Sequence, residues 1–304
     1  MNTSSRRPNP DQATVGILCA VGGFSLWGMF PIYFKALESV PALEVLAHRI
    51  VWSVVLLALV LWAIGSWNTA LSELRNWRKA GYYLLTTLLI SGNWLVYIWA
   101  VQHERVLEAS LGYYINPLVN VLLGVLFLQE RLRPYQQLAV ALASLGVLIL
   151  VSQHGVVPCV SLVLAVSFGS YGLLRKKADV NPLVSLFLET LLLTPAALCL
   201  LLVLALQGHG ALGTIDRQTD GLLLLAGVVT VVPLTLFLES TRRLRLATVG
   251  LVQYLTPTLQ FLLAVALYQE PFTRAHLVTF VCIWTALVIY SADAFSAGKA
   301  PVKV

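Results

Sequence analysis

Long apolar stretches of about twenty residues recur along almost the whole chain. A helix needs about 20 predominantly apolar residues to cross the hydrocarbon core of a bilayer. By this criterion the sequence predicts ten membrane-spanning helices. They cover residues 14–35, 43–64, 81–101, 108–128, 134–152, 158–175, 182–206, 220–239, 246–268 and 273–291. The tails and connections that remain leave no room for a soluble domain of useful size.

The composition excludes an ordinary soluble protein. Of the 304 residues, 58% are hydrophobic and only 11% are charged, and the mean hydropathy is +0.81. A soluble domain carries about 25% charged residues, because water must wet its surface. The net charge of +6 would suit a nucleic-acid ligand, but the basic residues lie in short clusters between apolar runs, which is typical of membrane topology. We therefore expect a lipid bilayer, and no nucleic acid, as a partner.

The distribution of Lys and Arg predicts the orientation, because cytoplasmic loops hold an excess of these residues. With the N-terminus in the cytoplasm, fifteen of the twenty fall in cytoplasmic segments and four on the opposite side, and Arg49 lies inside a span. One cytoplasmic cluster is Arg175, Lys176 and Lys177. The sequence thus predicts an all-α integral membrane protein with both termini in the cytoplasm.

Two halves of the chain resemble each other. The clearest matches are residues 114–130 with 254–270 and residues 24–28 with 168–172. The halves, residues 14–152 and 156–292, hold five predicted helices each, and because five is odd the second half enters the membrane from the opposite side. Inverted repeats of this kind are common in secondary transporters, where a substrate site lies near the midplane between the repeats.

Each half carries a polar stripe along one helix face, with the spacing i, i+3 and i+7. The stripes are Tyr113, Asn116 and Asn120 in the first half and Gln253, Thr256 and Gln260 in the second. Polar groups that face lipid cost free energy, so these stripes should face protein or water. They either join helices by hydrogen bonds or form the wall of a central cavity. Their recurrence beside Pro117 and Pro257 favours the cavity, because irregular backbone at membrane depth is tolerated there.

Two charged residues lie inside predicted spans at equivalent positions of the two halves, Arg49 and Glu189. Arg49 is about 12 Å into the membrane at 1.5 Å per residue, and Glu189 is at a similar depth from the other side. Each charge costs at least about 2.5 kcal/mol in the centre of a lone helix, so each needs a partner or an aqueous cavity. Either the two form a structural ion pair, or they are functional: Glu189 carries a proton, or Arg49 meets an anionic group of a substrate.

For four further residues, a structural role competes closely with a role in ligand binding or proton transfer. His48 lies one turn from Glu44 and can pair with it, although Glu44 is close enough to the interface to be solvated. A hydrogen-bonded packing role suits His48 better than proton relay. Asn93 either binds a ligand or joins a neighbouring helix. Trp27 and Tyr171 sit beside glycines, which permit close approach, so these rings either stack on a ligand or pack.

Absent motifs narrow the function. The sequence has no P-loop, no H-E-x-x-H metal site and no T-V-G-Y-G filter. The cysteines lie in apolar runs without a C-x-x-C pair, so neither a disulfide framework nor a zinc site is indicated. An enzyme would need a convergent nucleophile, acid–base pair or metal cluster. We therefore expect no enzyme activity, no metal and no cofactor.

Five strings of residues carry a resemblance to a known family. They are Glu44-Val-Leu-Ala-His48-Arg49, Asn93-Trp94, Tyr113-Tyr114-Ile115-Asn116-Pro117-Leu118-Val119-Asn120, Tyr171-Gly172-Leu173-Leu174-Arg175-Lys176 and Gln253-Tyr254-Leu255-x-Pro257. The chain resembles the EamA-type transporters of the drug/metabolite transporter superfamily, and within them the RarD branch, named for chloramphenicol sensitivity. One departure is Gln129, where we expect glycine.

The resemblance implies a ten-helix protein of the inner membrane, built from two inverted five-helix repeats around a central cavity. It implies a permease or exporter of a small metabolite or drug-like molecule. A proton is a candidate coupling ion, and a homo-oligomer is left open without being indicated. The alternatives are a lipid-carrier flippase, a membrane-embedded enzyme and a purely structural subunit.

Overall fold

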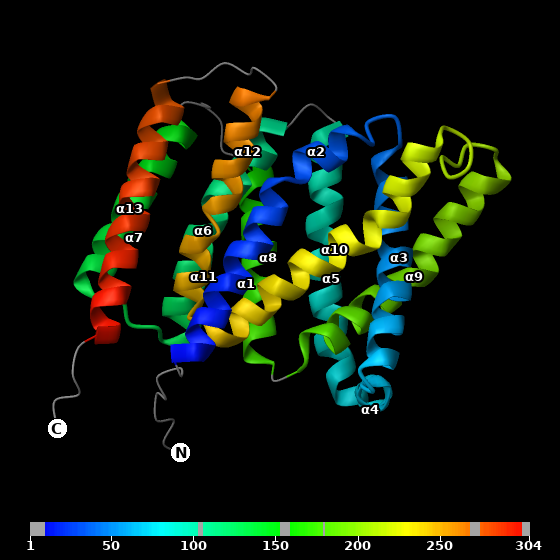
Figure 1. Cartoon of the computed structure of the whole chain (residues 1–304), viewed down its shortest axis with the longest axis horizontal. Helices are drawn as coiled ribbons and strands as arrows, with labels where there is room; N and C mark the ends of the chain where they lie inside the picture. Colours follow the sequence, from blue (N-terminus) through cyan, green and yellow to red (C-terminus); the bar gives the residue numbers. More distant parts are fainter. Residues whose placement is uncertain (1–9, 103–105, 153–158, 179, 268–273, 300–304) are drawn as a thin grey trace.

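The structure is a computed structural model that describes residues 10–102, 106–152, 159–178, 180–267 and 274–299. These residues form thirteen α-helices and no strand. The helices are α1 (Pro10–Gly28), α2 (Phe30–Lys35), α3 (Ala42–Ala63), α4 (Trp67–Arg75), α5 (Trp77–Gln102), α6 (Val106–Leu128), α7 (Pro134–Ser152), α8 (Cys159–Lys177), α9 (Pro182–Leu206), α10 (Arg217–Arg243), α11 (Leu246–Val252), α12 (Leu255–Ala266) and α13 (Arg274–Lys299). Most of them run back and forth between the two ends of one bundle (Figure 1).

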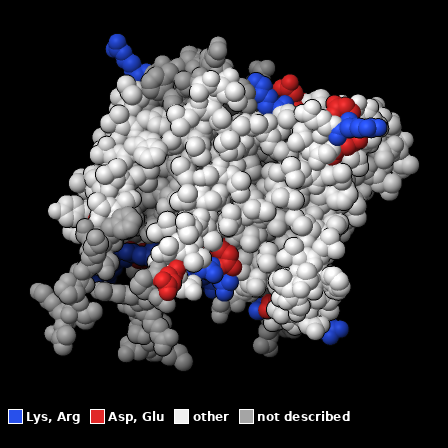
Figure 2. Space-filling view, viewed as in Figure 1, with Lys and Arg blue, Asp and Glu red and all other residues white. Residues whose placement is uncertain are grey.

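Several helices are suited to cross a membrane. Among the described residues, five segments are long and apolar enough to do so, namely Asp11–Lys35, Ala42–Ala63, Cys159–Lys177, Pro182–Leu206 and Arg217–Arg243. Figure 2 shows charged side chains at the two ends of the bundle and a broad uncharged surface between them. Large apolar side chains such as Leu59, Leu202 and Val288 are at least 60% exposed. A surface of this size and polarity is suited to contact lipid.

Two of the predicted spans are interrupted. The span predicted over 14–35 is divided at Met29 into α1 and α2, and the span predicted over 246–268 is divided at Gln253 and Tyr254 into α11 and α12. Pro257 cannot donate a backbone N–H to the carbonyl of Gln253 four residues earlier. That carbonyl instead accepts from the backbone N–H of Thr256 at 3.0 Å, which is the tighter spacing of a 3₁₀ turn.

Helices from the two halves of the chain pack against each other. α7 lies beside α13 at one edge of the bundle, and α3 lies beside α9 at the other (Figure 1). Between them, α6 contacts α8 and α11, and α1 contacts α10 and α12. At the crossing of α6 and α11, a Cβ atom on Gly250 would lie 2.7 Å from the carbonyl oxygen of Pro117. Only glycine allows so close an approach.

The connection that follows α6 ties the first half to the second. Gln129 has a φ of 54°, and in the described part of the chain it is the one non-glycine residue with positive φ. Its left-handed turn brings Glu130 to the start of α11. There the Glu130 carboxylate accepts from the backbone N–H groups of Leu246 and Ala247 at 2.7 and 3.0 Å. A carboxylate at this place satisfies free N–H groups and the positive end of the helix dipole.

The start of α10 is capped in a similar way. The Asp216 carboxylate accepts from the backbone N–H of Thr219 at 2.7 Å. This backbone hydrogen bond lowers the pKa of the Asp216 carboxyl below its ordinary value. The cap is therefore formed at neutral pH, where the carboxylate is charged.

Candidate functional site: a central cavity

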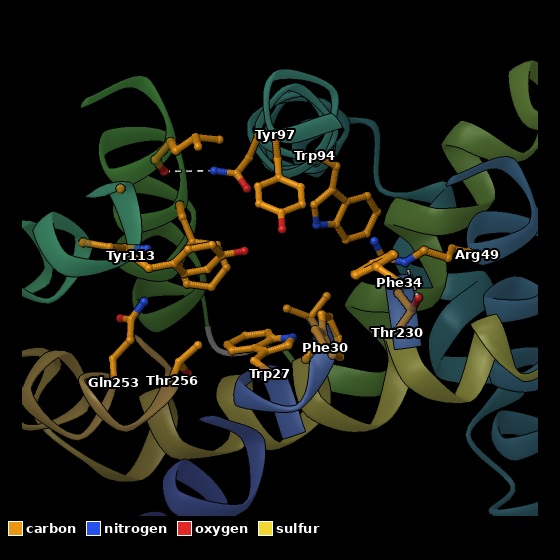
Figure 3. A pocket seen from close by; sticks show the side chains of 16 residues that line it. Trp27, Phe30, Phe34, Arg49, Trp94, Tyr97, Tyr113, Thr230, Gln253 and Thr256 are labelled. Carbon is orange, nitrogen blue, oxygen red and sulfur yellow. Dashed lines mark hydrogen bonds between the residues drawn. The ribbon is translucent and has the colours of Figure 1, made fainter. Parts of the chain in front are cut away.

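A cavity lies between the helices in the middle of the bundle, and both halves of the chain contribute to it. Its lining residues are Trp27, Phe30, Phe34, Arg49, Asn93, Trp94, Tyr97, Gly112, Tyr113, Asn116, Leu164, Phe168, Thr230, Leu234, Gln253 and Thr256. Figure 3 shows these side chains, ten of them labelled, arranged around an open centre. The wall is mainly aromatic, with a few amide and hydroxyl groups, and such walls are typical of small-molecule sites.

Arg49 is the one charged residue among the described residues of this wall. It is 8% exposed, and its Nε donates to Oγ1 of Thr230 at 2.9 Å. Its Cζ lies 5.0 Å from the ring centroid of Trp94, 5.6 Å from that of Phe34 and 6.0 Å from that of Phe30. The negative faces of aromatic rings attract a cation at such distances. In the part of the chain that the structure describes, Arg49 forms no ion pair with a carboxylate, so its charge is available to an anion.

The cavity continues into a wider vestibule. The inner part has a volume of ≈ 80 Å³ and the vestibule one of ≈ 600 Å³. Both are lined by Phe34, Arg49, Trp94 and Tyr97. Residues 37–42, in the connection from α2 to α3 and at the first residue of α3, form the mouth. In Figure 1 this connection lies at the end of the bundle opposite to the start of α1. The cavity therefore opens at that end.

Aromatic side chains close the other end of the cavity. Phe24, Tyr171 and Phe237 are fully buried. The ring of Phe237 lies 5.0 Å from that of Phe168 and 6.1 Å from that of Phe24, between ring centroids. Rings at these distances and tilts attract each other in addition to burying apolar area. They form a solid plug between the cavity and the ends of α8 and α10.

Beyond the plug lies a buried ion pair. Nη1 of Arg175 is 3.5 Å from Oε1 of Glu189, and the hydroxyl of Tyr171 donates to Oε2 of Glu189 at 3.0 Å. Arg175 is 5% exposed and Glu189 is 1% exposed. The sequence counted Arg175 with Lys176 and Lys177 in a cytoplasmic cluster and did not predict that its side chain is buried. Its guanidinium is buried because the Glu189 carboxylate compensates its charge.

Glu189 therefore pairs with Arg175 and not with Arg49, the ion pair that the sequence left open. The partner was missed because Arg175 stands at the end of an apolar run next to two lysines, where a basic residue is usually solvated. The signal in the sequence was the spacing between Tyr171 and Arg175, since residues four apart share one helix face. Tyr171, the other aromatic candidate, belongs to this cluster and to the plug.

The polar stripes take both roles that the sequence allowed. Tyr113, Asn116, Gln253 and Thr256 line the cavity. Asn120 lies behind the wall, where its Nδ2 donates to Oε1 of Gln253 at 2.7 Å and joins the two halves. Thr256 and Gln260 donate to backbone carbonyls of α1 at 2.9 and 3.2 Å. The stripes thus form the wall and also hold it together.

The remaining candidate residues also fall into two groups, those that line the cavity and those that pack outside it. Trp27 and Asn93 line the cavity. Nδ2 of Asn93 also donates to the backbone carbonyl of Leu164 in α8 at 2.9 Å. His48 is buried outside the lining residues, with Nε2 3.9 Å from Oε1 of Glu44.

Glu44 corrects a prediction. The sequence placed it near the interface, where water would solvate it, but it is 1% exposed. Its Oε1 accepts from the backbone N–H of Ala211 at 2.6 Å. The connection between α9 and α10 folds over the start of α3 and excludes water from the carboxylate.

Sequence reasoning also missed most of the aromatic wall. The missed residues are Phe30, Phe34, Trp94, Tyr97 and Phe168. An aromatic ring that faces a cavity has the same pattern along the chain as one that faces lipid. The one available signal was the proximity in the sequence of Trp94 to Asn93.

Comparison with known proteins places the chain among transporters. The EamA-like transporter family matches residues 14–152 and again residues 157–292. The chain is 50% identical to an uncharacterized transporter of Vibrio cholerae, over 96% of this chain and 97% of the relative. It is 42% identical to the protein RarD of Escherichia coli, over 93% and 96%. A chloramphenicol-sensitive protein RarD of Pseudomonas aeruginosa is 32% identical over 91% and 94%.

One solved structure has a fold similar to that of this chain. Its TM-score is 0.70 at 19% identity, and the match covers 93% of this chain and 99% of that one. The family, together with the long apolar helices, makes this a multi-pass membrane protein. The chain therefore belongs to the EamA-like transporter family, in its RarD branch.

Proposed function

We propose that the chain is a secondary transporter that moves a small metabolite or drug-like molecule across the inner membrane by alternating access. The observation that carries this proposal is the cavity itself. Both halves of the chain line it, it opens at one end of the bundle, and an aromatic plug closes it at the other. A site enclosed between two halves and reached from one side at a time is what alternating access requires.

Ten membrane passes in two inverted repeats form part of this proposal. α1 with α2 make one pass, α11 with α12 make another, and α4 makes none. The double match to the family supports two repeats. The contacts of α3 with α9, of α6 with α11 and of α7 with α13 each join elements at equivalent positions of the two halves, as a two-fold relation would require.

The orientation follows from the positive charges. With both termini in the cytoplasm, the mouth at residues 37–42 faces away from the cytoplasm. The structure would then be the outward-open state of an exporter or permease. A proton is the candidate coupling ion.

Transport by purified protein in liposomes tests the function. We expect counterflow of at least one member of a panel of metabolites and drug-like molecules, measured with and without a pH gradient. A response to the gradient would support coupling to protons. Transport of no panel member, or movement of lipid carriers alone, would contradict the proposed transporter.

The path through the cavity has its own test. The four native cysteines, Cys19, Cys159, Cys199 and Cys282, are first replaced by serine. Asn93→Cys places a thiol on the cavity wall, and Leu202→Cys, at a side chain 60% exposed on the apolar surface, is the matched control. A membrane-impermeant thiol reagent should block transport by the Asn93 variant alone, and from the outer side. Full transport by the labelled Asn93 variant would show that the substrate takes another path.

A further inference from the structure

The cavity also indicates the chemistry of its ligand. Resting on the proposed function, we infer that the substrate is a small organic anion with one flat ring. Its negative group binds the guanidinium of Arg49, and its ring lies among the aromatic side chains of the inner cavity.

The charge of the ligand follows from Arg49. A guanidinium has five N–H donors, and Thr230 accepts the one on Nε. Among the described residues none accepts from the two terminal nitrogens, which leaves them for a ligand. These nitrogens can hold a carboxylate by two parallel hydrogen bonds. A buried charge without a counter-ion is unfavourable, and a bound anion removes that cost. Anion binding therefore stabilises both partners.

The described residues offer a cation no such partner in the inner cavity. Among the described residues of its wall, none is acidic. Among the described residues that line the vestibule, Glu38 is the one carboxylate, and it is exposed at the mouth, where water screens it. The mouth thus carries a negative charge and the centre a positive one, and this arrangement favours an anion in the centre.

The shape of the ligand follows from the rings. The centroid of Trp27 lies 5.6 Å from that of Phe168, and the centroid of Tyr97 lies 6.0 Å from that of Tyr113. In Figure 3 the hydroxyls of Tyr97 and Tyr113 point into the open centre, where they can donate to an anion. Aromatic walls bind flat apolar groups by offset or edge contacts. The inner volume of ≈ 80 Å³ limits the ligand there to at most one small ring, and the rest of the ligand extends into the vestibule of ≈ 600 Å³.

Three compounds that share a phenyl ring and differ in charge test the inference. Phenylacetate is an anion at pH 7, phenylacetamide is neutral and phenethylamine is a cation. Isothermal titration calorimetry on the purified full chain should show phenylacetate binding at least about tenfold more tightly than the other two. Arg49→Gln should weaken phenylacetate binding about 30-fold or more and leave phenylacetamide unchanged.

Two variants separate binding from folding and from surface charge. Arg217→Gln removes a positive charge from an exposed position at the same end of the bundle, outside the cavity, and should leave binding unchanged. Arg49→Gln should keep or raise the unfolding temperature, because it removes a buried charge that has no counter-ion among the described residues. A purely structural arginine would lower that temperature when replaced.

Several results would overturn the inference. They are equal binding of phenylacetamide or phenethylamine, unchanged phenylacetate binding in Arg49→Gln, and no binding of any of the three. The proposed function is judged separately by the counterflow panel. If neutral or cationic molecules are transported while these compounds fail, the substrate class is wrong and the transporter stands.

Discussion

At the scale of single residues, the protein contains two buried arginines in opposite situations. Arg175 has the Glu189 carboxylate 3.5 Å away, behind the aromatic plug. Arg49 has aromatic rings and one hydroxyl around it, and it faces the cavity. Removal of a charge should therefore have opposite effects on stability at the two sites.

We expect Glu189→Leu to lower the free energy of unfolding by about 3 kcal/mol, because Arg175 is left charged and buried without a partner. The double variant Arg175→Met with Glu189→Leu should recover most of this loss, since a well-packed apolar pair can replace a buried ion pair. Denaturant or thermal unfolding in detergent measures the stability of the single and the double variant. Arg49→Gln is the control, and it should show no such loss. Equal destabilisation in the single and double variants would show that packing, not charge, holds the cluster.

At the scale of elements, a strained turn after α6 in the first half brings a carboxylate into contact with α11 in the second half. Gln129 adopts a left-handed conformation, which glycine adopts without steric cost, and the turn delivers Glu130 to the start of α11. The resemblance to the family had already indicated glycine at this position. The turn explains why, because the residue that ends a helix in this way is usually glycine.

Gln129→Gly should raise the free energy of unfolding by about 0.5–1 kcal/mol, because it relieves the left-handed strain. The matched control is Gln137→Gly, an exposed position inside α7, which should lower it by about 1 kcal/mol. The two unfolding midpoints should therefore shift in opposite directions. A loss of stability in both variants would mean that the Gln129 side chain contributes more than its backbone costs.

The sequence predicted several helices and several residues that line the cavity, for physical reasons. Apolar length identified the helices, and a polar residue inside an apolar run is costly enough to indicate a cavity, as it did for Asn116 and Gln253. The sequence did not predict the helix breaks at Met29 and Tyr254, because a proline nearby is compatible both with a bent helix and with two separate helices. Arg175 was missed because burial depends on a partner from another helix, which the sequence does not place.

At the scale of the whole molecule, an uncharged surface separates two charged ends (Figure 2). Leu192, near the middle of α9, is 47% exposed, and Leu206, its last residue, is 79% exposed. In water the more exposed residue would tolerate a polar replacement slightly better. In a bilayer the two positions differ much more in their tolerance of a polar residue, because the free-energy cost of inserting a charge depends on its depth in the membrane.

Leu192→Asp should therefore strongly reduce the yield of membrane-integrated protein, since a charge at the centre of a spanning helix costs about 2.5–3.5 kcal/mol. Leu206→Asp should retain most of the yield, because its carboxylate reaches the interface. Quantification of folded protein in the membrane fraction measures both. Similar yields would contradict the placement of α9 across the membrane.

The two indoles of the cavity have a practical consequence. Trp27 and Trp94 stand in the wall of the space that a substrate would fill (Figure 3). Indole emission shifts to shorter wavelength and changes in intensity when nearby water is displaced. With the other six tryptophans replaced by phenylalanine, the fluorescence of these two would report occupancy directly, without a label and in real time.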